Sequence, residues 1–306
     1  MIKKADIYKE KIKNLINKID QEISGENALR VTLLMTLFIL IMFMQHNQFL
    51  TGILFLLIPI GFLIHKVTLS KHYWAAIALF VTIGFIPLYH WADNHYFLTV
   101  YWAIAVALSM WSLNPKRNIA FNARVLIGLC FAFATFWKLM SPEFLEGTFF
   151  KFTMLTDWRF QELAEIVAGV TPDLRNYNNE MYRQIISSTD RIGSVNLAGT
   201  DFLKPFSIFM GYWTVFIEGW IAIAFLVPGN SKIGRWRDIP LLLFMISTYP
   251  IATVRGFAAL LAVMGFAQCT QENRHMRVVY LIVFICVPLF SLPFERITIE
   301  IINFFS

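Results

Sequence analysis

Apolar residues along this chain gather into long stretches that are separated by short polar connections. Stretches of about 15 to 23 apolar residues are long enough to cross the hydrocarbon core of a bilayer as helices. The pattern therefore predicts an all-α, polytopic integral membrane protein with about nine transmembrane helices. The predicted spans are 31–45, 49–65, 73–89, 96–112, 119–140, 206–228, 239–252, 254–271 and 277–292.

The composition supports the same class of protein. Of 306 residues, 57% are hydrophobic and only 15% are charged, and the mean hydropathy is +0.58, which is well above that of soluble domains. The three cysteines lie in apolar stretches without CxxC or Cys/His spacing, so the sequence predicts neither a disulfide framework nor a zinc site. No Walker, dinucleotide-binding, GxSxG or HExxH motif is present, which disfavours the enzyme classes that depend on them.

Residues 1–30 are charged throughout and lack the apolar core of a cleaved signal peptide. Apolar residues recur in this segment at helical spacing, and lysines fill the other faces. The pattern predicts a basic amphipathic helix that lies on a membrane surface, with anionic lipids as its partner. Nucleic acid is not expected as a partner, because acidic residues alternate with the lysines. Residues 31–306 are expected to form a single transmembrane domain.

Basic residues on the connections predict the orientation of the chain in the membrane. They lie on alternate connections, on the same predicted side as the basic N-terminus, and the positive-inside rule makes that side cytoplasmic. These residues are Lys66, Lys71, Lys116, Arg117, Lys232, Arg235, Arg237, Arg274 and Arg277.

The one long connection, 141–204, then falls outside the cytoplasm. It carries more acids than bases, and long loops are translocated largely regardless of their charge. We expect it to cap the outer ends of the helices, as lids do. A short amphipathic helix is predicted over 160–170, with the following apolar residues on one side: Leu163, Ile166, Val167 and Val170.

Lys138 lies two residues from the end of the predicted span 119–140. An ionisable residue inside a bilayer costs about 2.5 to 3.5 kcal/mol on insertion scales, so Lys138 is a candidate functional residue. The alternative is that its side chain simply extends to the lipid head groups.

Glu218 lies about 12 residues into the span 206–228, close to the expected midplane of the bilayer. Its helix carries a stripe of small or polar residues at steps of three and four, which predicts that this side faces the bundle or a cavity. A carboxyl group there is either neutral or paired with a cation or a ligand. A structural hydrogen bond to a neighbouring helix is the alternative interpretation.

Further polar residues gather toward the predicted outer side. His90, Asp93 and His95 lie between the third and fourth spans, and Arg255 begins the eighth. The histidines lie among aromatic residues typical of a membrane interface, and a metal site would need a third ligand that the sequence does not place. No metal is therefore assigned. Two acids follow Lys138 in the chain, Glu143 and Glu146, and they are candidate neighbours of its amine.

Residues 136–160 read FWKLMSPEFLEGTFFKFTMLTDWRF. A lysine closes a membrane helix, Leu139 and an acidic, aromatic turn follow, and Glu146 and Gly147 come next. This segment resembles the transmembrane part of vitamin K-dependent gamma-carboxylases and is similar to their bacterial relatives, the HTTM (horizontally transferred transmembrane) family. The resemblance implies that Lys138 is a base that deprotonates a quinol, and it favours a bacterial cytoplasmic (inner) membrane as the location.

The chain also departs from that family pattern. The spacing from Lys138 to Glu146 and Gly147 is one residue longer than in the carboxylases, and no large extramembrane region follows Ser306. Carboxylation of protein glutamates is therefore not expected. Residues 248–269 are similar to HTTM-like and DoxX-like bacterial membrane proteins, although DoxX proteins have about half the number of spans.

These features together suggest general-base chemistry on a lipophilic hydroxyl group, such as that of a quinol, near the outer leaflet. In this hypothesis Lys138 is the base, Glu218 lines the cavity or relays protons, and Arg255 or His90 holds an oxyanion or a hydroxyl. A quinone or another lipophilic small molecule is the expected ligand. Two other classes stay open: an ion-coupled transporter that uses Glu218, and a non-catalytic membrane scaffold.

Overall fold

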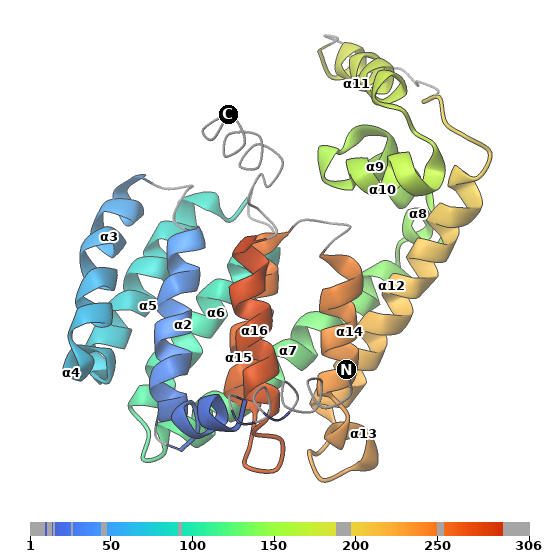
Figure 1. Cartoon of the computed structure of the whole chain (residues 1–306). Coiled ribbons are helices and arrows are strands. Elements are labelled where there is room, and N and C mark those ends of the chain that lie inside the picture. Colours follow the sequence, from blue (N-terminus) through green and yellow to red (C-terminus); the bar gives the residue numbers. More distant parts are fainter. Residues whose placement is uncertain are drawn as a thin grey trace, which may run out of the picture. The chain divides into compact units, whose positions relative to one another are not determined.

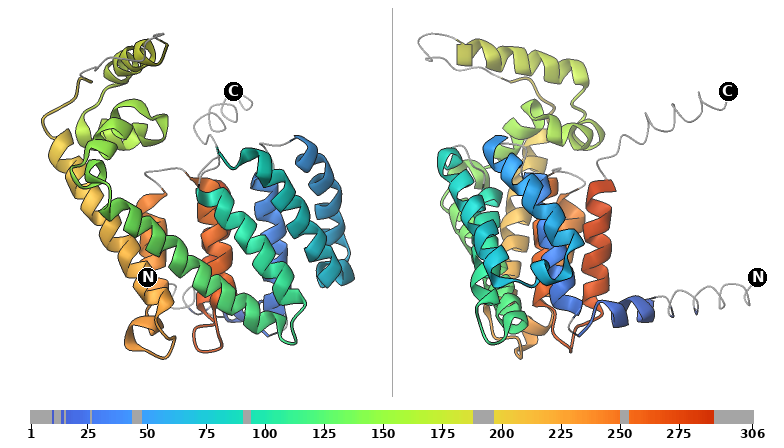
Figure 2. Two further views of the ribbon diagram at one scale, coloured as in Figure 1. Left: turned by 180° about the vertical axis from the view of Figure 1, so that it is seen from behind. Right: turned by 90° about the vertical axis from the view of Figure 1, so that its left-hand side faces the viewer.

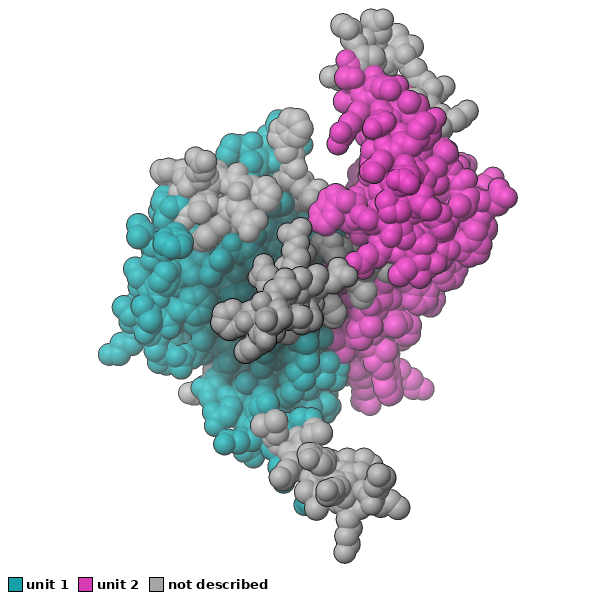
Figure 3. Space-filling view, turned by 45° about the horizontal axis from the view of Figure 1, so that its top comes forward, with its two compact units in different colours: residues 1–127, 254–306 teal, residues 128–253 magenta. Residues whose placement is uncertain are grey.

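The computed structural model describes residues 10, 14, 16–25, 27–43, 48–90, 94–187, 197–249 and 254–289. Within these ranges the regular structure is helical and contains no strand, so the predicted all-α class is confirmed. The chain divides into two compact units (Figure 3). Unit 1 comprises residues 1–127 and 254–306, and unit 2 comprises residues 128–253.

Each of the nine predicted spans contains a helix, and the helix ends differ from the predicted ends by a few residues. The helices are α2 (Asn27–Phe43), α3 (Gln48–Leu63), α5 (Lys71–Phe85), α6 (Asn94–Met110), α7 (Pro115–Leu139), α12 (Leu203–Leu226), α14 (Asp238–Thr248), α15 (Arg255–Gln268) and α16 (Met276–Leu289).

Among the described residues, three helices are long and apolar enough to cross a membrane: Lys71–Leu88, Pro115–Leu139 and Leu203–Leu226. A fourth is added if Ile16–Glu22 and Asn27–Phe43, which meet at a bend of 89°, form one span. The other apolar helices are shorter. A helix of about 14 residues rises about 21 Å, less than the roughly 30 Å of the hydrocarbon core. The structure thus supports an integral membrane protein, and the number nine stays a prediction.

Unit 1 is a helical bundle whose core is α15 (Figures 1 and 2). Helix α15 contacts α16, α2 and α6, and its residues 258–264 are fully buried. The approach of α15 to α16 is close, because a Cβ atom at Gly265 would lie 2.4 Å from the ring of Tyr280. A buried hydrogen bond joins α2 and α6 inside the unit: the indole of Trp102 donates to the hydroxyl of Thr36 at 3.0 Å.

Unit 1 also contains two short elements, α4 (His65–Thr68) and η2 (Ile86–Leu88). The predicted N-terminal amphipathic helix is described only in part. Residues 16–22 are helical, while 1–9, 11–13 and 15 lie outside the described residues.

Unit 2 contains the C-terminal half of α7, the helix α12, and the connection between them. The connection contains five short helical elements among its described residues: α8 (Pro142–Leu145), α9 (Thr148–Thr156), η3 (Trp158–Phe160), α10 (Gln161–Ala168) and α11 (Pro172–Ser187). Helix α9 packs against α12, α11 and α10 (Figure 2). After α12, the short α13 (Lys232–Arg235) leads into α14.

The connection has an apolar core that it shares with the first turns of α12. The buried members of this core are Phe144, Phe150, Met154, Leu155, Phe160, Ala164, Ala168, Val170, Leu203 and Met210. The core holds the start of the connection against α12, and it thereby fixes the turn that follows Lys138.

The short helix predicted over 160–170 is present as α10. Its buried side matches the predicted apolar side only in part. Val170 is buried and Leu163 packs against the same core, as predicted, whereas Ile166 is 84% exposed and Ala164 and Ala168 are buried instead. The two alanines let the α10 backbone come close to the neighbouring core, and the larger Ile166 points away from it.

Candidate functional site

Helices α7 and α12 lie against each other in unit 2 and run antiparallel. A Cβ atom at Gly128 would lie 2.7 Å from the side chain of Leu226, and one at Gly219 would lie 3.5 Å from Thr135. Residue numbers therefore rise along one helix as they fall along the other. Small residues at such contacts let membrane helices approach closely. This register places the C-terminal end of α7 beside the middle of α12.

Lys138 and Glu218 meet at this point. The Nζ atom of Lys138, in the last turn of α7, donates a hydrogen bond to the carboxylate of Glu218 on α12, and the two groups form an ion pair. The lysine side chain is 21% exposed and the glutamate side chain is 7% exposed. The structure thus places both of the leading candidate residues in one site, with a carboxylate deeper than the amine.

The turn after α7 adds an aromatic ring to the site. The Lys138 Nζ atom lies 5.4 Å from the centroid of the buried Phe144 ring on α8, within the range of a cation–π contact. The turn is held against α12 by two glycines. A Cβ atom at Gly211 would lie 2.5 Å from the Phe144 carbonyl oxygen, and Gly147 has φ +78° and would bring a Cβ atom to 2.7 Å from the Ile208 nitrogen.

Two further polar side chains of unit 2 lie near the pair. Cys130 precedes Lys138 by about two turns on the same side of α7, and its thiol is within electrostatic range of both Glu218 and Lys138. The buried hydroxyl of Tyr249, just after α14, has no hydrogen-bond partner among the described residues and is within electrostatic range of Cys130 and Glu218.

Sequence reasoning missed both of these residues. The spacing of Cys130 and Lys138 places them on one side of a helix and could have drawn attention to the thiol. No comparable signal existed for Tyr249, because its position depends on how α14 packs.

The remaining predicted residues lie elsewhere. Glu143 and Glu146 are exposed, and the ion pair of Lys138 is made with Glu218 rather than with either of them. His90 is exposed in unit 1, where its ring lies 3.6 Å from that of Tyr89. Arg255 begins α15, also in unit 1, and its side chain lies outside the described residues.

Three more observations bear on the neighbourhood of these residues. The ring of His95 stacks on Phe257 at 4.5 Å within unit 1. Asp93 lies outside the described residues. In the part of the chain that the structure describes, no three His, Cys, Asp or Glu residues are grouped so that they could hold a metal ion.

Outside the candidate spans, the ion pair of Asp157 with Arg159 shifts the titration of Asp157. Asp157 caps η3 and accepts hydrogen bonds from the backbone and the guanidinium of Arg159. Partial burial raises the pKa of Asp157, but the hydrogen bonds and the charge of Arg159 outweigh it, and the net effect is a pKa below the ordinary value.

No protein-family model, curated protein or solved structure matches the chain. The similarity of residues 136–160 to the gamma-carboxylases and the HTTM family is therefore a resemblance of one segment, and family membership stays a prediction.

Proposed function

We propose that this protein is a membrane enzyme in which Lys138 and Glu218 together accept a proton from the hydroxyl group of a lipophilic substrate, such as a quinol. The observation that carries the proposal is the ion pair itself. A partly exposed lysine at the end of an apolar helix donates to a nearly fully buried glutamate on the neighbouring helix. Ionisable groups at such positions are costly, which favours a functional role.

The pair offers a route to an uncharged lysine. An amine acts as a base only after it has lost a proton, and the carboxylate of Glu218 is hydrogen-bonded to the amine and can take that proton. Passing it along the hydrogen bond leaves a neutral amine and a neutral carboxylic acid, so no net charge is created in the site. Desolvation penalises the charged pair more than the neutral pair. Burial therefore reduces the difference in free energy between the ammonium–carboxylate pair and the amine–carboxylic acid pair.

The proton balance of the step is simple. The neutral amine takes the proton of the substrate hydroxyl, which becomes an oxyanion beside the newly formed ammonium group. Glu218 keeps its proton during this step. The ring of Phe144 lies over the amine and stabilises the ammonium form. The hydroxyl of Tyr249 is a candidate donor to a ligand oxygen, since it has no hydrogen-bond partner among the described residues.

Two further elements belong to the proposal. The resemblance of residues 136–160 to the carboxylases is independent support for Lys138 as the base. We also place the protein in a bacterial cytoplasmic membrane with a cytoplasmic N-terminus. All nine apolar helices cross the membrane in this arrangement, and residues 141–204 lie outside.

The test uses protein purified in lipid nanodiscs, whose bound lipids are extracted and measured by mass spectrometry. Wild type is compared with Lys138→Met, Glu218→Gln and the control Lys151→Met, which changes an exposed lysine on α9. We expect a quinone enriched over the bulk membrane in wild type and in the control, and lost in both site variants. Extracts that match the bulk membrane in all four proteins would overturn the proposal.

Turnover separates an enzyme from a transporter. A quinol analogue is supplied to the nanodiscs with dissolved oxygen as the electron acceptor, and its oxidation to the quinone is followed by absorbance. Proton transport is followed separately in liposomes with an enclosed pH-sensitive dye. An enzyme loses quinol oxidation in Lys138→Met. The transporter alternative rests on the depth of Glu218 in α12, and it predicts gradient-dependent transport that Glu218→Gln abolishes and Lys138→Met retains.

A further inference from the structure

Helix α12 carries a row of aromatic side chains along one side. The row advances by alternate steps of four and three residues, which is the heptad spacing of the contact line between two packed helices. At about 100° per residue, its members stay within about 40° of one line, and the row rises about 27 Å, close to the thickness of the hydrocarbon core. The members of this aromatic row are Phe202, Phe206, Phe209, Trp213, Phe216 and Trp220.

Neighbouring rings of the row contact each other. They form two runs, 202–209 and 213–220, in which successive ring centroids lie 5.9 to 6.4 Å apart. These contacts already restrict the side chains within one copy of the chain. Less side-chain entropy is therefore lost when a partner packs against the row than when it packs against freely rotating side chains.

The aromatic row is accessible from outside the chain. Phe202, Phe209 and Phe216 are more than half exposed, and Trp220 is 36% exposed. Glu218 lies two residues from both Phe216 and Trp220, so it is on the opposite side of the helix, where it is buried. The row is thus separate from the Lys138–Glu218 site.

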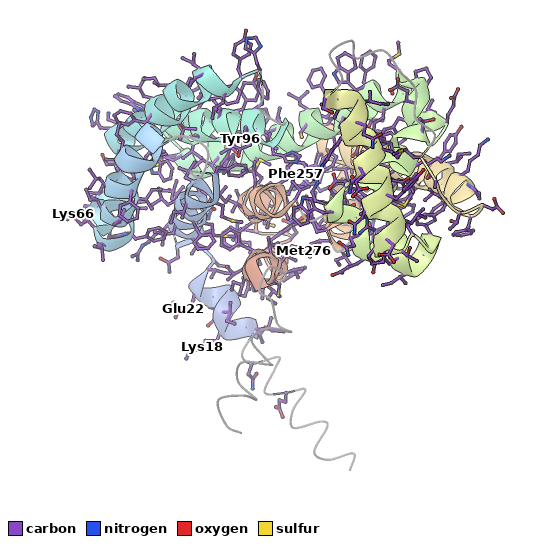
Figure 4. All side chains as sticks on the ribbon, turned by 90° about the horizontal axis from the view of Figure 1, so that it is seen from above. Lys18, Glu22, Lys66, Tyr96, Phe257 and Met276 are labelled. Atoms are coloured by element: carbon purple, nitrogen blue, oxygen red, sulfur yellow. The ribbon has the colours of Figure 1, made fainter. Side chains whose placement is uncertain are left out.

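The composition of the row distinguishes it from the other exposed helix faces. Side chains made largely of carbon point outward from the helices of both units (Figure 4), so exposure alone does not indicate a protein partner. Lipid covers such faces and places no demand on the type of apolar residue. The exposed large apolar residues of α5 with η2, and of α16, are all aliphatic: Leu79, Ile83, Ile86, Val279, Ile282 and Ile285. The α12 row is aromatic at every position.

The exposed area is large enough for a stable dimer. An aromatic side chain buries about 150 to 250 Å² when it is fully covered, so the exposed parts of the row and of the flanking Tyr212 and Ile223 offer roughly 600 Å² on each copy. Burial of most of this area on two copies reaches the roughly 1,000 Å² expected of a specific interface. Helices in lipid associate through close packing, to which ring–ring contacts add.

From these observations we infer that α12 packs against α12 of a second copy of this chain, in a parallel homodimer joined along the aromatic row. Helix α12 is long and apolar enough to cross a membrane, and two copies cross it in the same direction. The two-fold axis then runs along the membrane normal, and each residue of the row meets its own counterpart at the same depth. The inference does not depend on the proposed function.

Cysteine cross-linking of the full chain in native membranes tests this arrangement. Phe209→Cys and Phe216→Cys are made singly in a background without the three native cysteines. Tyr212→Cys is the matched control, because all three positions are 58% exposed on one helix and Tyr212 lies beside the row. With copper phenanthroline and oxygen as oxidant, we expect a disulfide-linked dimer from both row variants. Tyr212→Cys should give at least about five-fold less, since a disulfide needs Cα atoms within about 7 Å.

The affinity of the dimer is measured by energy transfer between labelled copies in liposomes at increasing dilution in lipid. The double variant Phe209→Leu/Phe216→Leu keeps the face apolar but removes two rings, and it is expected to weaken dimerisation about ten-fold. Tyr212→Leu should change the affinity less than about two-fold. If the double variant does not fold, the cross-linking decides. Equal cross-linking at the row and control positions, or an unchanged affinity in the folded double variant, would mean that lipid covers the row and would overturn the inference.

Discussion

At the scale of single residues, the Lys138–Glu218 pair predicts that substitutions of the two residues change the free energy of unfolding in a strongly non-additive way. Lys138→Met leaves a nearly fully buried carboxylate without its cation, which costs about 3 to 5 kcal/mol in buried pairs. Glu218→Leu costs less, because the lysine side chain is 21% exposed and can reach polar surroundings. The double variant Lys138→Met/Glu218→Leu replaces both charges by apolar groups and should recover most of the loss.

Unfolding of the four proteins in one detergent gives the coupling free energy of the pair. Additive losses in the double variant would mean that the two side chains do not interact in the folded protein. This measurement depends only on the contact, so it stands even if the proposed chemistry is wrong.

Three glycines allow a second prediction at this scale, because they differ in backbone conformation and in the room available for a Cβ atom. Gly147→Ala combines a left-handed φ of +78° with a clash against backbone, so it should cost more than the roughly 1 to 2 kcal/mol of the left-handed conformation alone. Gly169→Ala has φ +63° and a nearest contact of 3.7 Å, so it should cost only the conformational part. Gly52→Ala lies in α3 with open space and should stabilise the protein by up to about 1 kcal/mol.

Melting temperatures measured in one detergent rank the three glycine variants. The expected order of stability is Gly52→Ala above wild type, then Gly169→Ala, then Gly147→Ala. Equal effects of the Gly147 and Gly169 variants would contradict the close approach of the turn to α12.

At the scale of elements, the connection 141–204 shows where sequence reasoning succeeded and where it did not. The short helix over 160–170 was predicted correctly, because its apolar residues recur at helical spacing. Helices α9 and α11 were not predicted, since α9 carries apolar residues on most sides and α11 is largely polar. Periodicity predicted that Ile166 would be buried, whereas the packing buries Ala164. The periodic pattern shows which residues are apolar, but it does not show how closely a neighbouring element can approach the helix.

The same connection contains the third prediction, a pH dependence at the start of η3. The pKa of Asp157 is lowered in the folded protein, so its contribution to stability is present above the unfolded pKa of about 3.9 and is lost as the pH falls through the lower folded value. Arg159→Gln should therefore destabilise the protein near neutral pH. The loss should be at most about 1 kcal/mol, because the Arg159 side chain is 42% exposed.

Unfolding midpoints measured from pH 7 to pH 3 test this sign. The difference between wild type and Arg159→Gln is expected to shrink below about pH 4. Arg183→Gln, an exposed arginine on α11, serves as the control and should give a small difference without this pH dependence. A difference that persists unchanged at pH 3 would mean that the Asp157 carboxylate is not its source.

At the scale of the whole molecule, the apolar pattern predicted where the helices lie but could not predict which of them cross the membrane. All nine apolar stretches contain helices, yet among the residues that the structure describes three are long and apolar enough to cross as they stand, or four with the bent pair. The site was predicted in the same partial way. Sequence alone named Lys138 and Glu218 from the cost of burying charge, whereas their contact required the antiparallel register of α7 and α12.

The last prediction asks whether α6 crosses the membrane. Its 17 residues rise about 26 Å, so its length alone leaves the answer open. In the nine-span arrangement α5, α6 and α7 all cross between Lys66 and Lys151, and these two residues lie on opposite sides. If only the long helices α5 and α7 cross there, Lys66 and Lys151 lie on the same side. One impermeant label therefore distinguishes the two arrangements.

Both lysines are exposed and are replaced singly by cysteine in a background without the three native cysteines. A membrane-impermeant maleimide is applied to intact cells and then to permeabilised cells. We expect Lys151→Cys to react in intact cells, and Lys66→Cys and Lys232→Cys only after permeabilisation, since α12 returns the chain to the cytoplasmic side. If Lys66→Cys and Lys151→Cys both react in intact cells, or if both react only after permeabilisation, α6 does not cross, and the nine-span arrangement is wrong while the ion pair between α7 and α12 is unaffected.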